Sequence, residues 1–147
     1  MGSMEAALAE ARKLDQAGDA QGALRALEGA PREERGGAWH YARGAVAARL
    51  GQLDEAVALL EQAVQLEPEV AEYRSNLGAS LLEKLKAGDK ASGARALEQL
   101  ELAVQWGATL PEVYANLSFA RLAAGDTQGA IFAADEAVRL DPKHVAS

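Results

Sequence analysis

The amino-acid sequence predicts an all-α protein made of repeated pairs of helices. Hydrophobic residues make up 49% of the chain and aromatic residues only 5%, and much of the apolar material is alanine and leucine, which favour helices. Apolar residues recur at helical spacing, as in residues 56–64, and do not alternate as in strands. A stretch at residues 51–68, "GQLDEAVALLEQAVQLEP", is nearly repeated at residues 125–142 as "GDTQGAIFAADEAVRLDP".

Segments of this kind divide the chain into four units. Each contains a glycine followed by an alanine-rich helical pattern, at Gly18, Gly51, Gly88 and Gly125. The period is about 34 residues, with six additional residues in the third unit. We therefore expect a single domain over residues 4–147, with units at about 4–36, 37–70, 71–110 and 111–144. Residues 1–3, Met-Gly-Ser, are typical of a cloning remnant ahead of a natural start at Met4.

Two helices are expected in each unit, one on either side of the glycine. "WHYARGAVAARL", "YRSNLGASLLEKLK" and "VYANLSFARLAA" supply the first helices of the second, third and fourth units. Gly51 can adopt the left-handed conformation that ends a helix, and Asp54 or Thr127 can cap the helix that follows. Pro68 and Pro142 close the second helices, because the residue before a proline avoids the helical region. The pattern thus predicts eight helices.

The repeated unit resembles the tetratricopeptide repeat (TPR). The second unit matches the order of residues in that family at Gly44, Gly51, Leu53, Ala56, Leu60, Ala63 and Pro68. The fourth unit matches at Tyr114, Leu117, Gly125, Ala130, Ala137 and Pro142, although Ser118 replaces a glycine and Ala134 a large apolar residue. The resemblance implies a right-handed α-solenoid of about four TPR-like units, in which each unit is stabilised by stacking on its neighbours.

The third unit departs from this pattern through its six additional residues around "LEKLKAGDKAS". We expect the insertion to elongate both helices of that unit. Three more residues in each helix would add roughly 4.5 Å to its length, which would form a ledge at one edge of the stack.

No motif for catalysis, cofactor binding or metal binding occurs in the sequence. The chain has no cysteine, and its only two histidines, His40 and His144, are far apart. A catalytic or metal site needs converging partners, so His40 is interpreted as a packing residue of a first helix and His144 as part of a terminal tail. The chain is therefore not expected to be an enzyme, although an enzyme of an unrecognised kind remains one of three hypotheses for its function, beside the two described below.

The charge of the chain indicates which classes of partner to expect. A net charge of −7 and a pI of about 4.9 disfavour nucleic acids and anionic membranes, because both are themselves negative. No apolar run approaches the length of a membrane span. We expect a cytoplasmic protein, or a periplasmic one if a leader has been removed, and an unknown protein or peptide as its partner.

The resemblance implies where that partner would bind. In TPR proteins the first helices line a concave groove that holds a peptide or a partner helix. The positions of this sequence that match groove positions are Arg12, Tyr41, Arg49, Asn76, Leu82, Asn116, Phe119 and Leu122. An asparagine side chain can donate to and accept from one peptide unit, whereas Tyr41, Leu82 and Phe119 would form apolar pockets. The charged clamp of chaperone-binding TPR proteins is not matched here.

An alternative function is self-association as a structural scaffold. Ile131, Phe132 and Val138 lie in the last expected helix, and no further repeat follows them in this sequence. An exposed apolar flank favours association, so this hypothesis predicts a homodimer through the last helix.

Overall fold

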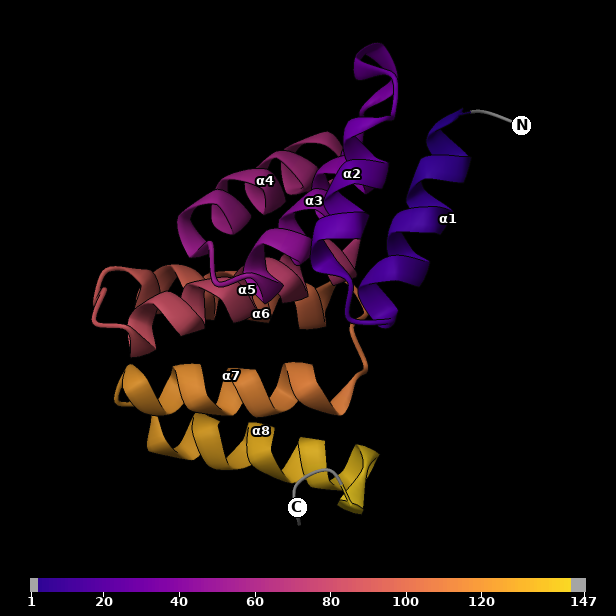
Figure 1. The fold of residues 1–147 in the computed structure, drawn as a ribbon. Coiled ribbons are helices and arrows are strands. Elements are labelled where there is room, and N and C mark those ends of the chain that lie inside the picture. Colours follow the sequence, from indigo (N-terminus) through magenta and orange to yellow (C-terminus); the bar gives the residue numbers. More distant parts are fainter. Residues whose placement is uncertain (1–2, 144–147) are drawn as a thin grey trace. The chain divides into compact units, whose positions relative to one another are not determined.

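The structure, a computed structural model, describes residues 3–143, which contain eight α-helices and one short 3₁₀ helix but no strand (Figure 1). The helices are α1 (Ser3–Gln16), α2 (Ala20–Glu28), the 3₁₀ helix (Arg32–Glu34), α3 (Gly37–Arg49), α4 (Leu53–Leu66), α5 (Ala71–Lys86), α6 (Ser92–Gln105), α7 (Pro111–Ala123) and α8 (Thr127–Leu140). The all-α class and the helix pairs are confirmed. The chain forms two compact units, residues 1–68 and residues 69–147, which are described separately.

Each compact unit contains two helix pairs. In residues 1–68, α1 pairs with α2 and α3 pairs with α4, and α3 also contacts both helices of the first pair. In residues 69–147, α5 pairs with α6 and α7 with α8, and α7 contacts both α5 and α6. The same two kinds of contact, within a pair and between successive pairs, therefore build both compact units. No helix among the described residues is long and apolar enough to cross a membrane.

The turn glycines act as the sequence predicts. Gly18, Gly51, Gly88 and Gly125 have φ angles of 86°, 79°, 109° and 87°, which is the left-handed region where glycine is favoured. The residue that caps α8 is Asp126 rather than Thr127, since its carboxylate accepts a hydrogen bond of 2.9 Å from the backbone of Gly129. The expectation for Asp54 was also wrong, because this residue lies in the first turn of α4, whose N-cap makes no side-chain hydrogen bond.

A glycine of the first helix lies against a leucine of the second helix in two of the pairs. A Cβ atom placed on Gly44 would lie 2.9 Å from Leu60 Cγ, and one placed on Gly78 would lie 2.6 Å from Leu100 Cγ. Both leucines are fully buried. Because these distances are shorter than van der Waals contact, only glycine permits this approach of the two helices.

The α7–α8 pair uses the opposite arrangement of sizes. Ser118 stands where α5 has its glycine, and Ala134 stands where α6 has its leucine. The hydroxyl of Ser118 donates a hydrogen bond of 2.7 Å to the carbonyl oxygen of Ala130. The smaller residue on α8 leaves room for the larger one on α7, and the serine hydroxyl is satisfied by the backbone it approaches.

The first helix pair is joined to the second by polar contacts around one buried tryptophan. Trp39, which is 7% exposed, donates a hydrogen bond of 2.9 Å from its indole nitrogen to the carbonyl of Leu27. The guanidinium of Arg35 lies 4.3 Å from the Trp39 ring centroid and also donates to the carbonyls of Glu28 and Ala30. These bonds hold the connection between α2 and α3.

The insertion lengthens only one helix of the third repeat. α5 has 16 residues, whereas the equivalent helices α3 and α7 have 13. α6 has 14 residues, as α4 and α8 do, so the expectation that both helices are elongated was wrong for α6. The remaining residues enlarge the connections, because residues 87–91 join α5 to α6 where residues 50–52 and 124–126 suffice in the neighbouring pairs.

We predict that Gly78→Ala destabilises the protein and that Gly93→Ala does not. The added methyl group at position 78 would overlap Leu100, which should cost about 1–3 kcal/mol of unfolding free energy. At Gly93 the added Cβ lies 3.5 Å from Leu85, an ordinary contact, and alanine should stabilise α6 by up to about 1 kcal/mol. Urea unfolding followed by circular dichroism measures both, and equal stability of the two variants would contradict the close-contact assignment.

Candidate functional site

The first helices of the third and fourth repeats contact one another in the second compact unit. α5 carries Asn76 and α7 carries Asn116 at equivalent positions of the repeat, and both side chains are half-buried. A half-buried carboxamide keeps part of its surface accessible to a ligand, and it can both donate and accept hydrogen bonds. The structure thus places the two predicted asparagines on neighbouring helices.

Phe119 and Leu122 are exposed apolar side chains on the same helix as Asn116. Phe119 is 42% exposed and Leu122 is 58% exposed. The Nζ atom of Lys86, at the end of α5, lies 4.8 Å from the centroid of the Phe119 ring, a cation–π contact that favours a fixed ring orientation. Because Lys86 belongs to the lengthened part of α5, the insertion brings a positive charge to the predicted binding residue.

The expectation for Leu82 was wrong. Its side chain is only 1% exposed and belongs to the core, so it cannot form a surface pocket for a partner. Leu81 beside it is also fully buried. The extended α5 therefore buries a wider apolar stripe than the repeat pattern alone indicates.

The remaining predicted residues lie in the first compact unit. Arg12 on α1 and Arg49 on α3 are exposed, whereas Tyr41 on α3 is half-buried. The Nε atom of Arg49 lies 2.7 Å from the Oδ1 atom of Asp15, so this arginine forms an ion pair between α3 and α1. Arg49 of the second repeat is therefore positioned by an ion pair with α1 of the first repeat.

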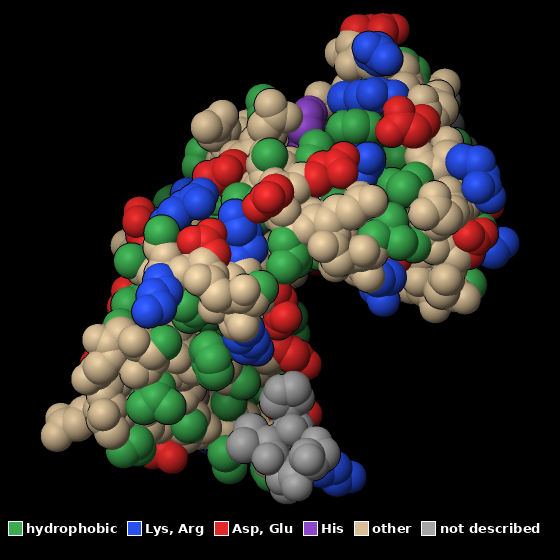
Figure 2. Space-filling model, turned by 60° about the vertical axis from the view of Figure 1, so that its left-hand side comes forward, with side chains coloured by type: hydrophobic (Ala, Val, Ile, Leu, Met, Phe, Trp, Pro, Cys, Tyr) green, Lys and Arg blue, Asp and Glu red, His purple; other side chains and the backbone are tan. Residues whose placement is uncertain are grey.

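The last helix exposes the three apolar residues proposed for self-association. Ile131 is 56% exposed, Phe132 63% and Val138 42%. Hydrophobic side chains are visible on the surface in the lower part of Figure 2, where α7 and α8 lie. The polar side of α8 carries an ion pair in which Arg139 donates to Glu136 at 2.7 Å. The hydrogen bond from Arg139 lowers the pKa of the Glu136 carboxyl, and the same bond raises the pKa of Arg139.

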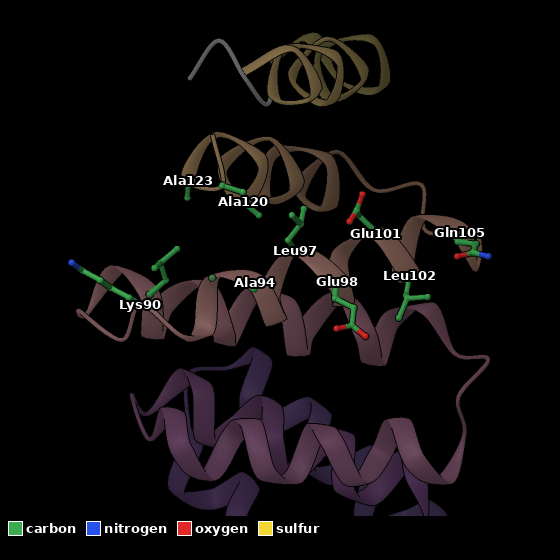
Figure 3. A pocket seen from close by; sticks show the side chains of 12 residues that line it. Lys90, Ala94, Leu97, Glu98, Glu101, Leu102, Gln105, Ala120 and Ala123 are labelled. Atoms are coloured by element: carbon green, nitrogen blue, oxygen red, sulfur yellow. The ribbon is translucent and has the colours of Figure 1, made fainter. Parts of the chain in front are cut away.

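A pocket between α6 and α7 was not anticipated from the sequence. It has a volume of about 650 Å³ and is lined mainly by alanine and leucine side chains (Figure 3). Leu97 on α6 points towards Ala120 and Ala123 on α7. The signal for this pocket was a concentration of small residues at both walls, Gly93 and Ala94 on α6 and Ala123 and Ala124 at the end of α7.

The described part of the chain contains no group of three or more acidic or histidine side chains that could hold a metal ion. His40 is half-buried and packs edge-to-face on Trp39, with ring centroids 5.1 Å apart. Its Nδ1 atom lies 2.8 Å from the carbonyl oxygen of Gly36. These contacts give His40 a packing role. His144 lies outside the described residues.

Helix pairs joined by a left-handed glycine and stacked through small residues define the helical-repeat class of proteins. Two family models match the sequence, one described as "TPR repeat" over residues 44–84 and one described as "Tetratricopeptide repeat" over residues 111–144. The two matches together cover just over half of the chain. The chain belongs to the tetratricopeptide-repeat family, and it is accordingly a protein–protein interaction module. No curated protein sequence matches it.

Solved TPR structures share the fold over nearly the whole chain. MamA from Desulfovibrio magneticus RS-1 (residues 41 to the end) has a TM-score of 0.79 and 25% identity, with 95% of this chain and 76% of that chain covered. TTC0263, a TPR protein of Thermus thermophilus, has a TM-score of 0.80 and 16% identity, with 95% and 75% covered. YrrB has a TM-score of 0.74 and 20% identity, with 92% and 67% covered.

We predict a low pKa for Asp89 in the enlarged turn before α6. The hydroxyl of Ser92 donates a hydrogen bond of 2.8 Å to the Asp89 carboxylate, and Lys84 lies 3.5 Å away. The hydrogen bond from Ser92 lowers the pKa of Asp89 most, and Lys84 lowers it further. The stabilisation from this carboxylate is present above its ordinary pKa of 3.8 and is lost as pH falls through the lower folded value.

An NMR titration of the side-chain carboxyl measures this pKa directly. Ser92→Ala should raise it towards the ordinary value, and Lys84→Gln should raise it by a smaller amount. If Lys84→Gln had the larger effect, the ion pair rather than the hydroxyl would determine the charge state of this turn.

Proposed function

We propose that the surface formed by α5 and α7 binds an extended segment of a partner protein. The observation that carries this proposal is the exposed ring of Phe119, which is contacted by Lys86 and lies on the same helix as Asn116. Exposed aromatic side chains are frequent energetic centres of interfaces. The exposed phenylalanine therefore offers a contact for an apolar side chain of a partner.

The neighbouring asparagines suit the backbone of such a segment. Asn76 and Asn116 are separated by one repeat and can each pair with one peptide unit through a donor and an acceptor. Leu122 extends the apolar contact by its 58% exposed side chain. Lys86 beside Phe119 forms an ion pair of 3.4 Å with Glu83 of the same helix, so its charge is already partly balanced.

The predicted residues of the first compact unit are proposed, within that unit alone, to contact a partner. Arg12 and Arg49 are exposed cations, and Tyr41 offers a half-buried ring with a polar tip. An acidic residue of a partner would complement Arg12, whereas the charge of Arg49 is already balanced by Asp15. Support for a peptide as the class of ligand comes from YrrB, a structural neighbour described as "a TPR protein with an unusual peptide-binding site".

The second candidate function is self-association through α8. The specific observation that favours it is the exposure of Ile131, Phe132 and Val138, all on one helix. Exposed apolar residues that cluster on one element are typical of association surfaces.

The cytoplasm is the proposed location for either function, since the chain has no cysteine for the disulfides of oxidising compartments.

Two phenylalanines allow the two surfaces to be distinguished. We predict that Phe119→Ala weakens binding of a partner isolated by affinity purification at least about tenfold, because truncation of an aromatic interface centre commonly costs about 2 kcal/mol or more. Phe132→Ala, which removes an equal side chain from α8, should leave this affinity unchanged. Asn76→Ala with Asn116→Ala should also weaken binding without changing the circular dichroism spectrum. Loss of affinity in Phe132→Ala alone would assign the partner to α8 instead.

Self-association has its own measurement. If α8 forms a homodimer contact, light scattering should show a mass that rises with protein concentration. The double change Ile131→Asp and Phe132→Asp should then restore the monomer, because two charges would be buried at the contact. A monomer at every concentration in the unaltered protein would exclude this function.

A further inference from the structure

The pocket between α6 and α7 is a candidate binding site separate from the α5–α7 surface. Leu85, Leu97 and Leu102 are half-buried and give it an apolar lining. Lys90 and Glu98 are exposed on its rim. A volume of about 650 Å³ lies within the range of ligand-binding pockets, which combine an apolar lining with a few polar groups.

The pocket exists because of features that are particular to the third repeat. Leu85 lies in the lengthened end of α5, and Lys90 lies in the enlarged turn that follows. Gly93 leaves space beside Leu85, since an added Cβ there would only just reach it, at 3.5 Å. The insertion thus supplies one end of the pocket, and the small residues of α6 and α7 keep it open.

The shape of the pocket indicates an elongated occupant. Its lining runs from Lys90, in the turn before α6, along that helix to Gln105, and Figure 3 shows these two residues at opposite ends. The helix from Ser92 to Gln105 alone is about 20 Å long. A trough of this length fits a segment of polypeptide better than a compact small molecule.

The charges on the trough differ between its two ends. Glu98 and Glu101 lie along the half that leads to the carboxyl end of α6 and give that half a negative charge. Glu101 is partly neutralised because its Oε2 atom lies 3.5 Å from Nη2 of Arg121. Glu98 is an exposed carboxylate, so it is the group on this rim that can meet a cation from a partner.

We propose that this trough binds a partner segment that carries aliphatic side chains along one face and a lysine or arginine opposite Glu98. The aliphatic side chains would enter between Leu97 and the alanines of α7, and the cation would complement the acidic half of the trough. This site uses the second helix of the third repeat and the face of α7 that contacts it. It does not depend on the proposed role of Phe119.

The test uses two synthetic peptides and the full chain labelled with ¹⁵N. Both peptides have the same length, matched to the trough, with leucine and alanine at the same places and with either lysine or glutamate at all remaining places. The lysine peptide should shift the amide signals of Gly93, Ala94, Leu97, Glu98 and Ala123 and reach saturation. The glutamate peptide should not.

Two variants and two matched controls identify the site. Glu98→Lys and Ala123→Phe should each weaken binding of the lysine peptide by about tenfold, the first through charge and the second by filling the trough. Glu10→Lys on α1 makes the same change of net charge, and Ala58→Phe on α4 adds the same ring to an exposed alanine. Neither control should change the affinity, and Phe119→Ala should not change it either.

The outcomes separate this proposal from a general attraction between a basic peptide and an acidic protein. Equal effects of Glu98→Lys and Glu10→Lys, or full binding by Ala123→Phe, would overturn it. Absence of binding, equal binding of both peptides, or shifts confined to α8 or to the surface around Phe119 would overturn it as well. Loss of partner binding in Phe119→Ala with an intact peptide response would leave the trough and the α5–α7 surface as two independent sites.

Discussion

The contact between a glycine on the first helix and a leucine on the second determines the spacing of the α3–α4 and α5–α6 pairs. Gly78 and Leu100 show the constraint most directly, because a methyl group on the glycine would lie 2.6 Å from the leucine Cγ atom. Helices at this distance bury their facing sides completely. All other side chains are then directed to neighbouring pairs or to solvent at positions that recur from one repeat to the next.

The last pair shows that the constraint concerns combined volume rather than particular residues. Ser118 and Ala134 break the repeat pattern together, and each change compensates the other. Cores tolerate such exchanges when total volume is kept. The added hydroxyl is also satisfied, because it donates to the carbonyl of Ala130 at 2.7 Å. Ser118 and Ala134 each depart from the repeat pattern, but together they keep the two helices packed.

The sequence predicted the features that are determined by local chemistry. Left-handed glycines such as Gly51, and the helices on either side of them, follow from turn conformation and apolar spacing over a few residues. Leu82 could not be judged in this way, since its burial depends on how far the apolar stripe of α5 extends. The trough beside Leu97 was not predicted either, because empty space depends on how the small residues of two successive helices, α6 and α7, pack in three dimensions.

In the second, third and fourth repeats, the same position of the second helix differs in how far its side chain is exposed. Val57, Leu97 and Ile131 are equivalent residues of the second helices, and all are aliphatic, but Val57 is 5% exposed and Ile131 is 56% exposed. Leu97 is half-buried and points towards α7, so an aliphatic residue at this position is suited to contact with a following helix. The next position carries Glu98 in the third repeat and Phe132 in the fourth. Because packing within the pair does not restrict this outward position, its chemistry can be selected for a partner, acidic beside the trough and aromatic on α8.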